Sequence, residues 1–188
     1  SATRQAFSDF LVSDVLAVAR PEGVQGGLGV GVTVAQALEA AEANLEKRFA
    51  GRLLAEATAR DALGKTWRNL AKYEQAERHL RRAVTAFEAD TTADPVRRAR
   101  ARLELGSLML DLSRYSEAAP ELDAALALAV RAGPRAGETR IEAAHAFGVL
   151  EEARGHGPEA EARRTARSTK RRAPTSGRNV RFESVRRV

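Results

Sequence analysis

The sequence predicts an all-α protein: a solenoid of antiparallel helix pairs, with two helices before it and a disordered basic tail after it. Three observations predict this fold. Alanine supplies 38 of the 188 residues and proline only six, a balance that favours packed helices. The chain resembles itself at a shift of 42 residues, and within each copy apolar residues recur at helical spacing. Because such units cannot bury their apolar faces alone, we expect successive copies to stack.

Two helices are expected in residues 1–50, ahead of the repeats. The first covers residues 3–19, whose apolar stripe is Phe7, Phe10, Leu11, Val15, Leu16 and Val18. Thr33, with Gln36 three residues later, has the form of a capping box and predicts a second helix over residues 34–49 that covers the first repeat. Its stripe is Val34, Ala37, Leu38, Ala41, Leu45 and Phe49. Between these helices, the glycine spacing of residues 21–31 fits no phosphate-binding loop, and we interpret this segment as a flexible linker.

Three helix pairs are expected in residues 51–168. Their register is set by Leu63-Gly64, Leu105-Gly106 and Phe147-Gly148, and twelve residues after each glycine comes Ala76, Ala118 or Ala160. These small residues are expected where the two helices of a pair cross, so that the backbones can approach. In the first pair, Ala71-Lys72 makes the turn.

The helix starts are expected at cap signals. Asp94-Pro95 has the form of an N-cap followed by proline at the first helical position, and Gly157-Pro158 opens the last helix in the same way. If Ser116 caps its helix, Pro120 falls in about the first turn. The last helix carries Arg164 and Arg167 on its otherwise apolar stripe, as expected of a solenoid end that faces water.

Charge is unevenly distributed along the chain. The net charge is +6, yet residues 163–188 hold ten Lys or Arg and one acid, Glu183, which leaves residues 1–162 at −3. Residues 169–188 are therefore expected to be a disordered basic tail. Such a tail binds nucleic acid or an anionic membrane surface through counterion release, or it only keeps the chain soluble.

Several classes of function are excluded or disfavoured. Without cysteine there is no disulfide framework, thiolate zinc site, iron–sulfur cluster or cysteine nucleophile, and no apolar run is long enough to cross a membrane. His79, His145 and His156 are too scattered for a metal site; we interpret His79 and His156 as solvated. We expect no metal, no cofactor and no small-molecule substrate.

The motif of the copies resembles the tetratricopeptide repeat. The match covers about residues 53–167 and is full in two copies and partial in the third. Its pattern is Leu-Gly, a large residue three positions on, then Tyr, Ala, Leu and Ala. The 42-residue period resembles the long-helix variant of kinesin light chains and many bacterial proteins. The resemblance implies a non-catalytic domain that binds a protein or peptide in a concave groove.

A narrower resemblance is to the region that joins the membrane segment to the repeats in bacterial receptor-like serine/threonine kinases. It is carried by Phe10-Leu11-Val12, Ala19-Arg20-Pro21, Thr33-Val34, Leu38, Arg48-Phe49, Leu63-Gly64 and Ala76-Glu77-Arg78-His79-Leu80. The chain itself has none of the catalytic motifs of a kinase, so we expect no enzyme here. Met109 is the only methionine, and we expect a processed protein or a piece of a longer one. The expected location is the cytoplasm for a free-standing chain, or the soluble region of a membrane-anchored kinase.

The tetratricopeptide resemblance implies which residues line the groove: those three before each repeat glycine and one, four and five after it. The positions so assigned are Asp61, Lys65, Arg68 and Asn69, then Leu103, Ser107, Leu110 and Asp111, then His145, Val149, Glu152 and Ala153. The candidate partner-binding residues among them are Lys65, Arg68, Asn69, Ser107, Asp111 and His145. The first three would form a corner able to hold a carboxylate or phosphate. The alternative is that all of them only solvate the groove.

Overall fold

The computed structural model describes residues 2–19, 29, 31–90 and 92–155, and every regular element in these ranges is a helix. The chain divides into two units, residues 1–150 and 151–188, and the fold set out below is that of the first. The predicted all-α class is confirmed for the described residues. Several expectations lie outside them: most of the linker, His156, the helix expected after Gly157-Pro158, and the tail at residues 169–188.

The N-terminal helix changes its hydrogen-bonding pattern twice. It begins as α1 (Ala2–Phe10), continues as the π-helix η1 (Leu11–Val15) and ends as the 3₁₀-helix η2 (Leu16–Ala19). Phe10 and Val18 are buried as expected, but Leu11 is 38% exposed and Leu16 is 64% exposed, so the predicted stripe is wrong at these two positions. The physical reason is that each change of helix type alters the angular step per residue, so a 3.6-residue extrapolation points to the wrong face.

Helix α2 (Val34–Arg48) begins at the predicted capping box. The Gln36 N–H donates to Thr33 Oγ1 at 3.3 Å, and the Thr33 N–H donates to Gln36 Oε1 at 2.9 Å. Its stripe is buried from Ala37 to Leu45 and at Phe49, whereas Val34 is exposed. The Phe49 ring packs against Phe10, with 5.5 Å between ring centroids, and so joins α2 to α1.

Two helix pairs follow, and their boundaries repeat at the predicted interval. The first pair is α3 (Leu53–Asn69) with α4 (Tyr73–Ala89), and the second is α5 (Pro95–Asp111) with α6 (Tyr115–Ala132). A 3₁₀ turn, η3 (Gly133–Ala136), leads into α7 (Gly137–Gly155). The starts of α3, α5 and α7 are thus 42 residues apart, and so are those of α4 and α6.

The repeat glycines lie where the helices of a pair cross. A Cβ atom on Gly64 would lie 2.5 Å from Leu80 Cγ, and one on Gly106 would lie 2.7 Å from Leu122 Cδ2. Both distances are too short for real contacts, so the absence of a side chain is what allows α3 to approach α4 and α5 to approach α6 this closely. Around Gly148 no described atom comes within 4 Å of the Cβ position.

The turns inside the two pairs have the same backbone geometry. Ala71 and Ser113 adopt left-handed conformations, with φ of 56° and 57°. After them, the Lys72 N–H donates to the Trp67 carbonyl at 2.9 Å, and the Arg114 N–H donates to the Met109 carbonyl at 2.8 Å. These bonds satisfy carbonyls that the end of a helix leaves free.

The cap expected at Asp94 is confirmed, and the cap considered at Ser116 is wrong. The Asp94 carboxylate accepts from the Val96 N–H at 3.0 Å, and Pro95 is the first residue of α5. Ser116, however, lies inside α6, which begins at Tyr115, and Pro120 is its sixth residue. The turn geometry at Ser113 and Arg114 starts this helix earlier than a side-chain cap would.

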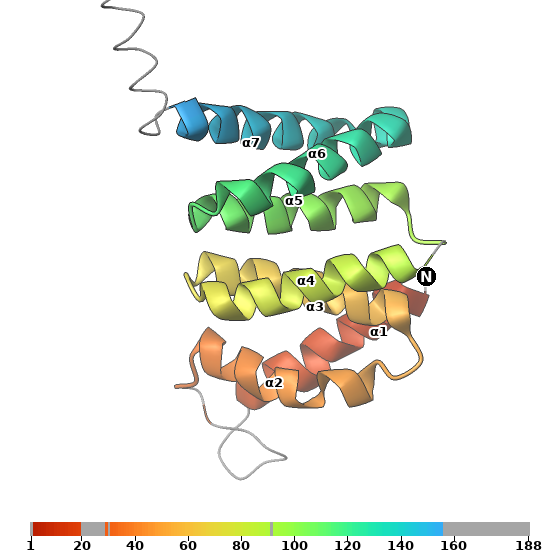
Figure 1. The fold of residues 1–188 in the computed structure, drawn as a ribbon. Coiled ribbons are helices and arrows are strands. Elements are labelled where there is room, and N and C mark those ends of the chain that lie inside the picture. Colours follow the sequence, from red (N-terminus) through yellow and green to blue (C-terminus); the bar gives the residue numbers. More distant parts are fainter. Residues whose placement is uncertain (1, 20–28, 30, 91, 156–188) are drawn as a thin grey trace, which may run out of the picture. The chain divides into compact units, whose positions relative to one another are not determined.

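One large hydrophobic cluster draws residues from all the described α-helices of residues 1–150, and a second, smaller cluster consists of Ala99, Leu128, Ala129 and Ala136. Helix α1 packs on α3, α2 packs on α3 and on the N-terminal π and 3₁₀ segments, and α4 packs on α5, so that the two pairs are neighbours (Figure 1). The largest fully buried side chains are Trp67, Phe10, Phe49, Leu45, Leu80, Leu108, Met109, Leu122 and Leu150. Leu150 shows that α7 contributes to the same core.

Candidate functional site

A surface hollow of about 480 Å³ lies between α5 and α7, with one residue of α3 at its edge. Its lining residues are Arg68, Leu103, Glu104, Ser107, Ile141, Glu142, His145 and Ala146, and we call it the α5–α7 hollow. All of them come from the first helix of a repeat copy. The hollow therefore lies among the helices that the tetratricopeptide resemblance assigns to the groove.

Three of the six predicted site residues line this hollow: Arg68, Ser107 and His145. They come from α3, α5 and α7 respectively, and the sequence spacing brings them to one face as expected. Lys65 and Asp111 lie beside the hollow and reach its rim through ion pairs. Asn69, the last residue of α3, is exposed and does not line the hollow.

The two cations of the predicted basic corner are already paired with carboxylates. Lys65 Nζ lies 3.0 Å from Asp61 Oδ2 and 3.3 Å from Glu104 Oε1. Arg68 lies 3.5 Å from Glu104 Oε2 and donates from Nε to Asp111 Oδ2 at 2.5 Å. The capture of an anionic group by this corner stays a prediction, and these contacts disfavour it because an incoming anion would have to displace a carboxylate.

Three of the residues that line the hollow are apolar: Leu103, Ile141 and Ala146. Leu103 and Ala146 are buried, whereas Ile141 is 69% exposed. An exposed isoleucine next to buried leucine offers a site where a partner's apolar side chain loses contact with water. The lining also includes the Ser107 hydroxyl, the His145 imidazole and the carboxylates of Glu104 and Glu142. It therefore suits a side chain that has both an apolar and a polar part.

Sequence reasoning missed four lining residues: Glu104, Ile141, Glu142 and Ala146. Glu104 and Ala146 both stand two residues before their repeat glycines, a position that the family-derived rule did not include. The signal was available, because residues three or four positions apart share a face of a helix. Glu104 stands three residues before Ser107, and Ile141 and Glu142 stand four and three residues before His145. Glu142 is exposed and has no ion-pair partner among the described residues, so its carboxylate is free for a ligand.

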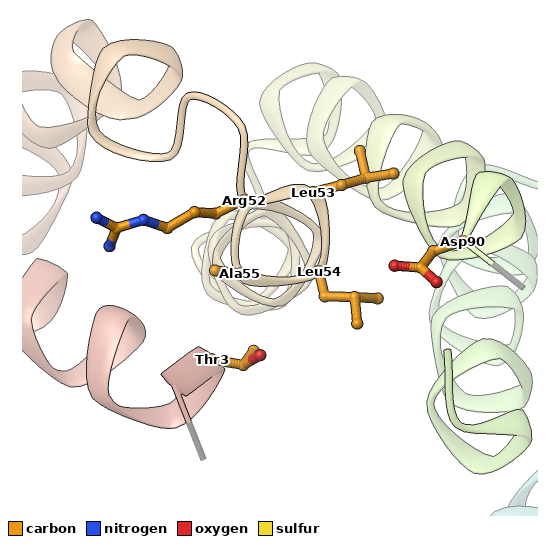
Figure 2. Close-up of a pocket in the computed structure, with 6 residues that line it drawn as sticks. All are labelled: Thr3, Arg52, Leu53, Leu54, Ala55 and Asp90. Atoms are coloured by element: carbon orange, nitrogen blue, oxygen red, sulfur yellow. The ribbon is translucent and has the colours of Figure 1, made fainter. Parts of the chain in front are cut away.

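A second hollow, of about 300 Å³, lies where the starts of α1 and α3 meet the end of α4. Its lining residues are Thr3, Arg52, Leu53, Leu54, Ala55 and Asp90. Figure 2 shows the Arg52 guanidinium extending away from the Asp90 carboxylate, on the other side of α3. Since its polar groups do not converge, this hollow is the weaker candidate.

A buried polar cluster lies away from both hollows, where α2 meets α3 and α4. His79 is only 2% exposed, so the interpretation of this residue as solvated is wrong. Its Nε2 lies 2.9 Å from Glu42 Oε1, but neither ring nitrogen makes a hydrogen bond of good geometry within the described part of the chain. Glu42 also accepts from Trp67 Nε1 and from Arg78 Nη2.

The environment of His79 disfavours its protonated form. Burial lowers the pKa of His79, and the nearby Arg60 and Arg78 lower it too, which together outweigh the opposing effect of Glu42. His79 is therefore a neutral structural side chain above its ordinary pKa of 6.5. Its place on α4, three residues after Ala76 and four before Ala83, is the sequence signal that could have predicted its burial.

Comparisons with family models, with curated proteins and with solved structures found no match for this chain. Among the described residues, no group of three or more His, Asp or Glu side chains could hold a metal ion. None of the described helices combines the length and apolar character needed to cross a membrane.

Proposed function

We propose that this chain is a tetratricopeptide-type helical repeat protein whose function is to bind a protein or peptide partner without catalysis. The partner occupies the face formed by α3, α5 and α7. The single observation that carries the proposal is the α5–α7 hollow, which is lined by equivalent helices of three successive copies.

Two further features support the repeat assignment. The helix boundaries recur every 42 residues, and the glycines of the first two copies stand at equivalent crossings against Leu80 and Leu122. Repeated helix pairs that pack only on their neighbours create extended surfaces suited to peptides rather than enclosed pockets suited to small molecules. The hollow fits this pattern, since it opens to solvent between two first helices.

The wider setting that we propose is bacterial signalling, with this chain as the repeat region of a serine/threonine kinase or of a related scaffold. The support for it is the motif resemblance in residues 10–80. In that setting catalysis would reside elsewhere in a longer polypeptide, and this region would select the partner. A free-standing chain would act as a cytoplasmic adaptor.

The test is to select twelve-residue peptides by display on the immobilised full chain and to measure their affinities for variants. Ser107→Lys fills the hollow with a longer side chain, and the fold should tolerate it because Lys65 stands at the equivalent position of the first copy. We expect the selected peptides to lose at least tenfold in affinity. Ala127→Lys, on the exposed face of α6, is the matched control and should bind as the unchanged protein does.

Peptides that bind both variants equally would refute the groove as the binding site. Circular dichroism of Ser107→Lys separates this outcome from loss of the fold.

A second candidate function is favoured by one observation, the ten Lys or Arg in residues 163–188. A segment of this charge binds nucleic acid or anionic surfaces with little sequence preference and with strong salt dependence. Under this alternative, deletion of residues 169–188 abolishes a salt-dependent mobility shift with duplex DNA and leaves peptide binding intact. No shift with the full chain at low salt would exclude it.

A further inference from the structure

The charges around the α5–α7 hollow are unbalanced toward acid. Four carboxylates, those of Asp61, Glu104, Asp111 and Glu142, accompany only two cations, Lys65 and Arg68. Because both cations are engaged by the first three carboxylates, the negative charge of Glu142 is uncompensated within the described part of the chain. Among the residues that line the hollow, the two carboxylates of Glu104 and Glu142 thus outnumber the one cation, Arg68.

Four more cations lie on α5 before the hollow, Arg97, Arg98, Arg100 and Arg102, and none of them lines it. Arg97 donates to Thr58 Oγ1 at 3.0 Å, and Arg100 lies 3.6 Å from the carboxylate of Glu138. The excess of carboxylates is therefore found where Leu103, Ile141 and Ala146 also line the surface.

From this combination we infer that the hollow recognises a basic peptide in which an arginine or lysine stands close to an apolar side chain. The apolar side chain packs against Leu103, Ala146 and the exposed Ile141. The cationic group reaches the carboxylate of Glu142, with the aliphatic part of its side chain lying along the apolar residues of the hollow. This inference rests on the proposed function and specifies the chemistry of the partner.

The inference makes the partner's charge the reverse of the one that the sequence alone suggests. The sequence alone suggests that Lys65 and Arg68 bind an anion, because it does not show their neighbours on the next helix. Glu104 and Asp111, which the fold brings from α5, convert that corner into a closed ion-pair network. Glu142 on α7 is the one carboxylate of this group without an ion-pair partner among the described residues, and it therefore favours a cationic ligand.

The test uses two pools of twelve-residue peptides with a neutral fluorophore, measured by anisotropy on the full chain. Three fixed positions are arginine in one pool and glutamine in the other, and the remaining positions are drawn from Leu, Ala, Ser and Gln. Acidic peptides are left out because the cations of residues 163–188 would attract them regardless of the hollow. The variants are Glu142→Gln and, as a control of equal charge, Glu74→Gln on the exposed side of α4.

We expect the arginine pool to bind more tightly than the glutamine pool and Glu142→Gln to weaken the arginine pool about two- to fivefold, the effect of one exposed charge pair. Glu74→Gln should leave its affinity unchanged. The inference would be overturned if both pools bound equally well and Glu142→Gln did not change their affinity. If Ser107→Lys still abolished that binding, the proposed function would stand. Failure of both pools to bind, or binding that survives Ser107→Lys, would overturn both.

Discussion

At the scale of single residues, His79 links the fold to pH. The ring is buried between Glu42 and two arginines, and its pKa is lowered. Below its ordinary pKa of 6.5, the unfolded chain takes up a proton at this position and the folded chain does not, so acid favours unfolding. The stability that depends on the neutral ring is complete above pH 6.5 and is lost as the pH falls toward the folded-state pKa.

This predicts the effect of His79→Gln on the pH dependence of stability. The wild-type protein should lose stability between pH 7.5 and 5.5 more steeply than the variant, by up to about 1.4 kcal/mol per pH unit. Urea unfolding at each pH measures the slopes. Thr85→Gln, on an exposed part of the same helix, should keep the wild-type slope. Identical slopes for wild type and His79→Gln would show that the buried ring does not govern acid sensitivity.

The two left-handed turn residues give a second prediction at this scale. Ala71 and Ser113 have φ near 56°, a conformation that costs a residue with a Cβ about 1–2 kcal/mol and glycine very little. Glycine also makes the unfolded chain more flexible, which offsets part of this gain. Ala71→Gly and Ser113→Gly should therefore each stabilise the protein by about 0.5 kcal/mol.

The control for the turn variants is Ala127→Gly in the exposed interior of α6, where glycine should destabilise by about 1 kcal/mol. Denaturant midpoints compare the three variants with the wild type. A loss of stability in both turn variants would mean that the turns are not strained.

At the scale of elements, the repeat glycines decide how closely two helices pack. Because an added Cβ would meet Leu80 or Leu122, Gly64→Ala and Gly106→Ala should each destabilise by about 1–3 kcal/mol through overpacking. At Gly148 no described atom lies within 4 Å of an added Cβ. Gly148→Ala should therefore raise the free energy of unfolding by up to about 1 kcal/mol, because alanine has the higher helix propensity. Thermal and urea unfolding measure all three variants.

The opposite result at Gly148 would also be informative about the fold. A loss there as large as at Gly64 would contradict the open surface and indicate that a segment after α7 packs against it. No change at Gly64 or Gly106 would contradict the close crossing of the helices.

Much of this element structure could be predicted from the sequence, because its determinants are local. The capping box at Thr33, the Asp94-Pro95 start and the glycine crossings are each set by residues a few positions apart or by an exact repeat. The exposure of Leu11 and Leu16 could not be predicted, since a change of helix type shifts the face that residues share.

The sequence could predict which residues lie near the candidate site, but not which charge of ligand the site would favour. The repeat register brings Arg68, Ser107 and His145 to one hollow. Whether Lys65 and Arg68 can hold an anion depends, however, on Glu104 and Asp111, which stand about 40 residues away in sequence. Ion pairing between neighbouring helices is a property of their packing, and a motif within one helix does not contain it.

At the scale of the whole molecule, the described helices of residues 1–150 share one large hydrophobic cluster, and the α5–α7 hollow lies on their surface. The first helices of the copies carry the hollow, whereas the second helices, α4 and α6, carry exposed ion pairs such as Arg81 with Glu117 at 2.9 Å. Such exposed pairs contribute little to stability. The first helices supply core side chains such as Trp67 and Leu108, and they also form the face that we propose binds a partner.

The most direct test of the central claim is an NMR titration of the ¹⁵N-labelled full chain with a peptide obtained in the display selection. The account predicts that backbone shift changes concentrate at the turns of α3, α5 and α7 that carry Arg68, Ser107 and His145. It also predicts that the exposed faces of α4 and α6 remain unchanged. Shift changes confined to α4 and α6, or to residues 169–188, would contradict it.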